Sequence, residues 1–164
     1  MPHPTAPPHE AVRQTYLVAA SLAVDLVASP DVGAAWDRPS ILPGYSVGGL
    51  AAHLGRALVT VDTYLAAPPP EPAAPRVDAV SYFVAALAKH DPVASAFHGA
   101  VRERSEQAAA AAPGSVADGL RAIHDRLAAR ALDLSQPLSV LDGMGITLGD
   151  YLRTRLVELT VHGA

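Results

Sequence analysis

The sequence TLGDYLRTRLVELTVH, residues 147–162, has the pattern of an amphipathic helix. Its leucines recur every three or four residues and predict one apolar stripe, which consists of Leu148, Leu152, Leu156 and Leu159. Thr147 followed by Asp150 resembles a capping box, with Asp where Glu is more usual, and predicts where the helix begins. A second stripe carries polar groups, so these side chains need either partners inside the protein or contact with water. It consists of Tyr151, Arg155, Glu158 and His162.

Glu158 and His162 are four residues apart, so both side chains can reach one point beside an α-helix. A carboxylate oxygen and an imidazole nitrogen at that point would supply two of the three ligands of a His2Glu metal site. The third ligand must come from another helix. His53 and His124 both lie within apolar helical patterns, and spacing alone does not choose between them. The same pair also fits an ordinary structural role, as a solvated acid and a hydrogen-bonded histidine.

The rest of the chain predicts further helices, at residues 9–29, 46–66, 78–112 and 115–131. Ser46 is the expected N-cap of the second, and Ser115 with Asp118 is expected to begin the fourth. The pair Asp91-Pro92 should kink or interrupt the third, because proline removes a backbone donor and restricts the residue before it.

The sequences between these helices predict connections. PPPEPAAP, residues 68–75, is expected to be stiff and extended, and residues 137–141 predict a short extended piece. The sequence therefore predicts an all-α fold, a helix bundle with one kinked or broken helix and a Pro-rich loop, without paired strands. Its 164 residues are expected to form one domain, 1–164, in which the Pro-rich residues 1–8 are flexible.

The composition argues against several functional classes. A net charge of -4 and only one lysine, Lys89, argue against a nucleic-acid-binding surface. The N-terminal residues lack the features of a signal peptide, and no apolar run approaches the length of a membrane span, so we expect a cytoplasmic protein. There is no cysteine, so disulfides and thiolate-ligated zinc are excluded. Thiol chemistry would therefore need a sulfur atom from outside the protein.

Two blocks of sequence carry a resemblance to a known family. The first, WDRPSILPGYSVGGLAAH at residues 36–53, joins a tryptophan and a Pro-Gly-aromatic turn to a helix that reaches Ala-Ala-His. The second, YLRTRLVELTVHG at residues 151–163, is an Arg-Leu-x-Glu-x-x-x-His helix. In this order they resemble the mycothiol-dependent maleylpyruvate isomerase N-terminal domain family, which belongs to the DinB/YfiT-like group of metal-binding four-helix bundles. Tyr45 stands where that family more often has tryptophan.

The resemblance implies a set of ligands. It favours His53 over His124 and implies that His53, Glu158 and His162 bind a divalent metal ion, usually taken as zinc. The remaining positions would be left to water or to the thiol of mycothiol, the low-molecular-weight thiol of actinobacteria. The Ala-, Pro- and Arg-rich, lysine-poor composition agrees with an actinobacterial source.

A metal site with three protein ligands and an open position can lower the pKa of a bound thiol. The expected function is therefore mycothiol-dependent transfer to, or isomerisation of, a small electrophile. Arg155 is expected either to orient the thiol cofactor or an acidic substrate, or to pair with Glu158 and fix its rotamer. The alternative, from a different class, is a metal-binding helical interaction module without turnover.

The end of the chain departs from the family pattern. Members usually continue past the histidine, whereas this sequence stops at Gly163-Ala164. Activity on maleylpyruvate itself is therefore not expected. His162 lies close to the terminus, where helices fray. A truncated chain or closure of the site by a partner subunit would each explain this position, and a homodimer is a further expectation.

Overall fold

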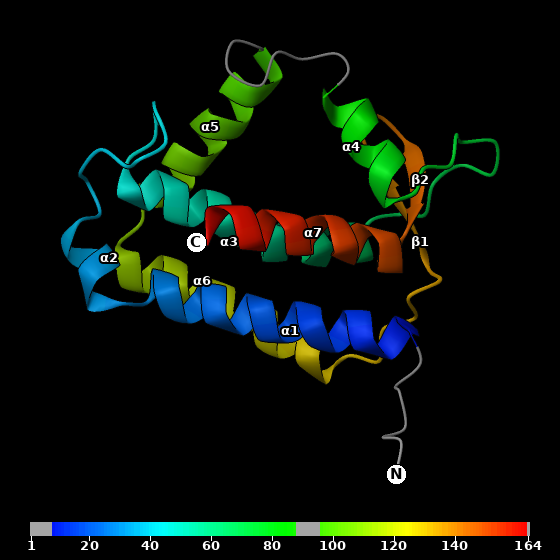
Figure 1. Ribbon diagram of the computed structural model, residues 1–164, viewed down its shortest axis with the longest axis horizontal. Helices are drawn as coiled ribbons and strands as arrows, with labels where there is room; N and C mark the ends of the chain where they lie inside the picture. The colour runs from blue at the N-terminus through cyan, green and yellow to red at the C-terminus, as the bar shows by residue number, and fades with distance from the viewer. Residues whose placement is uncertain (1–7, 88–95, 164) are drawn as a thin grey trace.

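The computed structural model describes residues 8–87 and 96–163, which form seven helices and one pair of short strands (Figure 1). The helices are α1 (Pro8–Val27), α2 (Pro30–Ala34), α3 (Val47–Ala66), α4 (Ala79–Leu87), α5 (Ala96–Ala109), α6 (Pro113–Ala129) and α7 (Leu148–His162). The strands are β1 (Pro137–Val140) and β2 (Met144–Thr147). The fold is mostly helical, as predicted, but the sequence did not predict the pair of strands.

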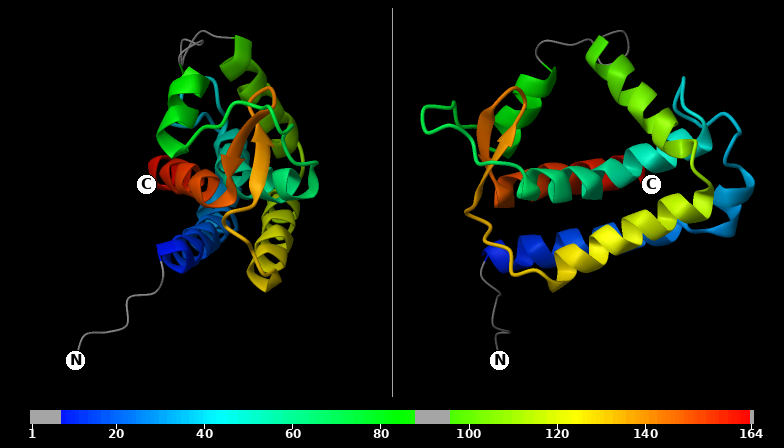
Figure 2. Two further views of the ribbon diagram at one scale, coloured as in Figure 1. Left: turned by 90° about the vertical axis from the view of Figure 1, so that its right-hand side faces the viewer. Right: turned by 180° about the vertical axis from the view of Figure 1, so that it is seen from behind.

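The long helices α1, α3, α6 and α7 pack against one another around the core. α7 contacts α1 and α3, and α6 contacts the same two helices (Figures 1 and 2). Each of the four contributes a side chain that is at most 1% exposed: Tyr16, Leu58, Leu127 and Leu152. The DinB-like four-helix bundle is not confirmed by this packing and stays a prediction.

The segment predicted as one interrupted helix, residues 78–112, contains two separate helices. α4 packs on α7, whereas α5 packs mainly on α3 (Figure 2). The predicted cause of the interruption, Asp91-Pro92, lies outside the described residues, as does most of the N-terminal segment predicted to be flexible. α5 ends at Ala109, three residues earlier than predicted.

The start of α6 also differs from the prediction. The helix begins at Pro113, and its N-cap is Ala112, which makes no side-chain capping bond, instead of Ser115. Proline is well suited to the first helical position, because its fixed φ matches the helix and its missing N–H would have no intrahelical partner there.

Hydrogen bonds and close packing hold the first turn of α3 against its neighbours, and these contacts position the helix that carries His53. Ser46 is the N-cap, as predicted, and its hydroxyl accepts a hydrogen bond from the amide of Gly49. Trp36 packs so closely on Gly48 that a Cβ there would lie 2.5 Å from its ring. The same indole donates a 2.9 Å hydrogen bond to the carbonyl of Ala109 at the end of α5. The loop before α3 is therefore held between α3 and α5.

The β1–β2 hairpin sets the start of α7. β1 matches the predicted extended piece, and it pairs antiparallel with β2 across a turn at Leu141, Asp142 and Gly143, all of which have positive φ. The Pro-rich connection leads to this hairpin, where the carbonyl of Pro75 accepts a 2.8 Å hydrogen bond from the amide of Gly145.

α7 follows β2 directly, and Thr147 caps it by accepting a 3.1 Å hydrogen bond from the amide of Asp150. This confirms the predicted helix start. The return bond of the capping box differs, because the Asp150 carboxylate accepts from the hydroxyl of Thr147 and not from its amide. Aspartate is one methylene shorter than the usual glutamate.

Within residues 8–87 and 96–163, every helix is too short or too polar to cross a membrane. The predicted cytoplasmic location stays a prediction.

Candidate metal centre

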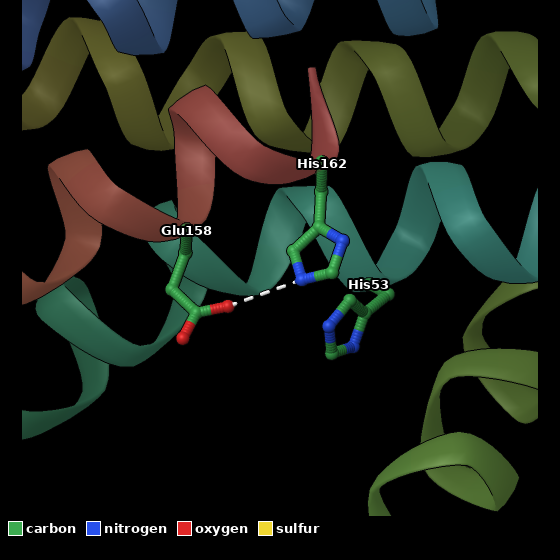
Figure 3. Close-up of side chains that lie close together, drawn as sticks. All are labelled: His53, Glu158 and His162. Carbon is green, nitrogen blue, oxygen red and sulfur yellow. Dashed lines mark ion pairs between the residues drawn. The ribbon is translucent and has the colours of Figure 1, made fainter. Parts of the chain in front are cut away.

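The structure brings His53, Glu158 and His162 together between α3 and α7 (Figure 3). Each offers one ligand atom, and these atoms lie within 4.8 Å of one another. Nε2 of His162 is 3.3 Å from a carboxylate oxygen of Glu158, which is the i, i+4 contact predicted from the sequence. The rings of His53 and His162 meet edge to face, with centroids 4.7 Å apart. The three side chains therefore converge on one point from two helices.

His53 has a buried ring nitrogen that needs a partner. Its Nδ1 atom is buried and makes no hydrogen bond to any residue that the structure describes. Burial, together with the neighbouring His162, lowers the pKa of His53 to about 4. The imidazole is therefore neutral at physiological pH, which is the form that binds a metal ion. A divalent ion would also compensate for the missing hydrogen bond, so the donor set fits such an ion.

Glu158 supplies the negative charge of the site. The hydrogen bond from His162 lowers the pKa of this carboxyl group, and the nearby guanidinium of Arg155 lowers it further, although burial opposes both. The carboxylate is therefore ionised at neutral pH. A neutral imidazole, a carboxylate and a second imidazole make a set of ligands suited to zinc and to several other divalent ions.

The three residues lie on the wall of a cavity of about 520 Å³. Helices α3, α4, α5 and α7 and the loop before α3 all contribute to its walls. This volume is large enough for a small molecule beside a metal ion. A second cavity, of about 620 Å³, lies between α4 and α7, and its lining does not include any of the three residues.

Arg155 is buried on α7, and its side chain lines the smaller cavity. Its guanidinium carbon lies 4.8 Å from the ring centroid of Tyr151 and 5.6 Å from that of Tyr82, and Nε donates a hydrogen bond to the hydroxyl of Thr154. The proposed pairing with Glu158 does not occur as a direct ion pair; Arg155 influences that carboxylate through its charge. The two tyrosine rings, not Glu158, position the guanidinium.

His124, the competing histidine, lies outside this site. It is on α6, where Nε2 is 3.2 Å from the carbonyl oxygen of Leu17 and Nδ1 is 3.3 Å from the carboxylate of Asp125. These contacts explain its place beside an apolar stripe. It has the role of a hydrogen-bonded packing residue.

Sequence reasoning missed several polar residues that line the cavity, among them Tyr45, Arg56 and Arg102. Arg56 lies almost one turn after His53 on α3, and Tyr45 lies in the turn of the first sequence block. Their positions relative to His53 could therefore have placed both residues near the site. Arg102 could not be placed in this way, because the sequence does not reveal that α5 packs on α3.

The model of the mycothiol maleylpyruvate isomerase N-terminal domain family matches residues 18–164. The match includes both blocks of sequence and all three residues of the candidate site. No curated protein and no solved structure gives a significant match to the chain.

Proposed function

The chain belongs to the mycothiol maleylpyruvate isomerase N-terminal domain family, and from this membership we propose that it is a metal-dependent enzyme that uses mycothiol. His53, Glu158 and His162 would hold the ion, for which zinc is our first choice. The observation that carries the proposal is the convergence of these three ligand atoms beside a cavity.

A divalent ion with three protein ligands supplies Lewis acidity, which lowers the pKa of a thiol bound to it. The chain prepares the site for this ion. The buried surroundings of His53 keep its imidazole neutral, and the hydrogen bond from His162 favours the ionised form of Glu158. His53 and Glu158 therefore need not lose protons at neutral pH before they bind.

The reaction we propose is addition of the thiol to a small electrophile. A sulfur–carbon bond forms as the π bond of an unsaturated electrophile breaks, and the thiol proton passes to the neighbouring carbon of the electrophile. In a transfer reaction the adduct is the product. In an isomerisation the adduct rotates about the new single bond, the neighbouring carbon loses its proton, the sulfur–carbon bond breaks as the double bond re-forms, and the sulfur leaves and regains a proton as the free thiol. Arg155, held by Tyr82 and Tyr151, is our candidate for orienting the thiol cofactor in the cavity.

The alternative function, a metal-binding interaction module without turnover, is supported by a different observation. Four valines of α4 and α7 are between 48% and 73% exposed: Val80, Val84, Val157 and Val161. An apolar surface of this kind is suited to binding another protein. Under this alternative the metal would be structural and no thiol would bind.

Elemental analysis combined with a thiol titration tests the proposal. We expect about one divalent ion per chain in the wild type, little in His53→Ala and His162→Ala, and wild-type content in the control His124→Ala. Mycothiol should then bind saturably to the metal-loaded wild type. Equal metal content in all four proteins would contradict the site, and metal without thiol binding would favour the interaction module.

Further sequence predictions remain proposals. We propose that residues 1–164 form one domain of the DinB-like bundle type, which is supported by the packing of α1 on α7. We also retain the homodimer as a proposal, with the exposed valines of α4 and α7 as a surface available for it.

A further inference from the structure

Three arginines from three different helices line the cavity beside the candidate metal centre. They are Arg56 on α3, Arg102 on α5 and Arg155 on α7. None of them forms an ion pair with a residue that the structure describes. Glu158 is the only acidic residue among the described residues of the lining, and it is one of the candidate ligands. The side chains of the cavity wall therefore carry more positive than negative charge.

Arg56 and Arg102 line the same cavity as Tyr45. Nη1 of Arg102 lies 3.3 Å from the position that a Cβ on Gly44 would occupy, so the guanidinium packs on the turn that carries Tyr45. Burial raises the pKa of the Tyr45 hydroxyl; the positive charges of Arg102 and Arg56 oppose this rise, and the negative charge of Glu106 adds to it. The ring of Tyr45 is in turn 5.5 Å from that of His53. Two guanidinium groups and a hydroxyl donor therefore lie beside the metal centre.

Arg155 differs from these two arginines in its surroundings. Its guanidinium faces the rings of Tyr82 and Tyr151, which compensate part of its charge by cation–π contact. Arg56 and Arg102 have no such ring contacts among the described residues, and both are only partly exposed. Partly buried guanidinium groups without a carboxylate partner are suited to receive an anion from a ligand.

We propose that Arg56, Arg102 and the hydroxyl of Tyr45 form an anion-binding subsite that receives the carboxylate group of the electrophile. This inference rests on the proposed function and names the class of its substrate. The walls of the cavity add a second requirement, because many of their side chains are apolar, among them Leu42, Pro43, Ala57 and Val101. The ligand is therefore an aromatic or branched aliphatic carboxylate, with its apolar body along these walls.

The geometry also gives this subsite a role in the reaction. A carboxylate held by Arg56 and Arg102 lies on the side of Tyr45, next to His53. The remaining part of the electrophile then extends toward the point where His53, Glu158 and His162 converge. Guanidinium groups bind carboxylates in a fixed orientation, so the subsite would determine which carbon of the substrate faces the thiol.

Benzoate is a suitable probe, and benzamide is its neutral counterpart of the same shape. Binding is measured by calorimetry or by NMR titration at low ionic strength, on protein freed of metal by chelation and on His53→Ala. These two samples remove the possibility that the carboxylate binds the metal ion. The variants are Arg56→Gln, Arg102→Gln and Tyr45→Phe. Arg104→Gln is the matched control, because Arg104 is exposed on the same helix as Arg102 and does not line the cavity.

We expect saturable binding of benzoate to the metal-free protein, with an affinity that falls about tenfold in Arg56→Gln and in Arg102→Gln. Tyr45→Phe should lose less, and Arg104→Gln should bind like the wild type. Benzamide should bind at least tenfold more weakly than benzoate. Benzoate binding that is unchanged in both arginine variants would overturn the subsite, as would equal affinities for benzoate and benzamide or a preference for inorganic phosphate.

The result of the benzoate experiment can be distinguished from the result of the metal and thiol tests of the proposed function. If the metal and thiol tests fail but benzoate binds as expected, the anion subsite exists and the chemistry assigned to the metal centre is wrong. If metal and thiol bind but benzoate does not, the metal centre stands and the substrate class is wrong. Circular dichroism of each variant shows whether it is folded, and Tyr45→Phe provides a test that changes a single hydroxyl group.

Discussion

The carboxylate of Glu106, on α5, accepts two hydrogen bonds from Ser46 at the start of α3. One comes from the backbone amide at 2.8 Å and the other from the hydroxyl at 2.9 Å. The same hydroxyl accepts a hydrogen bond from the amide of Gly49. The carboxylate of Glu106 therefore orients the residue that caps α3. α3 carries His53 and Arg56, whereas α5 carries Arg102. This contact therefore aligns the two helices that form one side of the cavity.

Removing this carboxylate should weaken the fold. We expect Glu106→Gln to lower the free energy of unfolding by about 1–2 kcal/mol, because the amide side chain replaces a charged acceptor and brings donors that have no acceptor at Ser46. Glu103→Gln is the control, since Glu103 is exposed on the same helix and the charge change is identical. Urea denaturation measures both. Equal stabilities of the two variants would contradict the role assigned to Glu106.

The close contact of Trp36 with α3 predicts opposite effects for one substitution at two sites. A Cβ at Gly48 would lie 2.5 Å from the indole ring, whereas a Cβ at Gly119 on α6 would meet nothing within 4 Å. Gly48→Ala should therefore destabilise the protein by about 1–3 kcal/mol through overpacking. Gly119→Ala should stabilise it by about 0.5–1 kcal/mol, because alanine favours the helix. Thermal unfolding would show melting temperatures that move in opposite directions, and a shift in the same direction would contradict the packing described for Trp36.

The lowered pKa of His53 predicts a pH dependence for the metal-free protein. Its pKa is about 4 in the folded state and 6.5 for an unperturbed histidine, so between these values the unfolded chain binds a proton that the folded one does not. Stability is therefore complete above pH 6.5 and falls as the pH decreases toward 4, by about 3 kcal/mol for this group. Denaturant titrations at several pH values, compared with His53→Ala, measure the effect. The variant should have a flatter profile in this interval, and identical profiles would show that His53 is not responsible.

Metal binding should stabilise the fold through the same residues. If zinc binds the folded chain at His53, Glu158 and His162, a zinc concentration one hundred times the dissociation constant should add about 2.7 kcal/mol to the free energy of unfolding. Thermal unfolding with zinc and with a chelator measures this difference. We expect Glu158→Gln and His53→Ala to lose most of it, whereas His124→Ala should retain it. Retention of the full stabilisation in Glu158→Gln would place the ion elsewhere.

Much of the helical structure could be predicted from local sequence, because the signals are local. The cap at Ser46 and the cap at Thr147 each depend on residues within one turn, and both were confirmed. The i, i+4 contact of Glu158 with His162 follows from helix geometry alone. The hairpin was missed although its three-residue turn contains Asp142-Gly143, a pair typical of hairpin turns. Its two strands are only four residues long, which is too short for a clear alternation of apolar and polar residues.

The cavity was harder to predict because its wall comes from elements that are distant in sequence. His53 could be chosen over His124 only through the family resemblance, since both have the same helical spacing. The anchoring of α5 by Glu106 and Trp36 depends on tertiary contacts that no local pattern reveals. Arg102 enters the cavity wall as a consequence of that anchoring. Its proximity to Tyr45 is therefore a property of the folded chain.

The point where α3 and α7 meet joins residues that are separated by more than half of the chain. An ion held there by His53, Glu158 and His162 would act as a reversible cross-link in a protein that has no cysteine. Such a link closes a long loop and restricts the unfolded ensemble, much as a disulfide does. Unlike a disulfide, it would depend on the supply of metal and not on the redox state of its surroundings. The lifetime of the folded chain would then follow the availability of that metal.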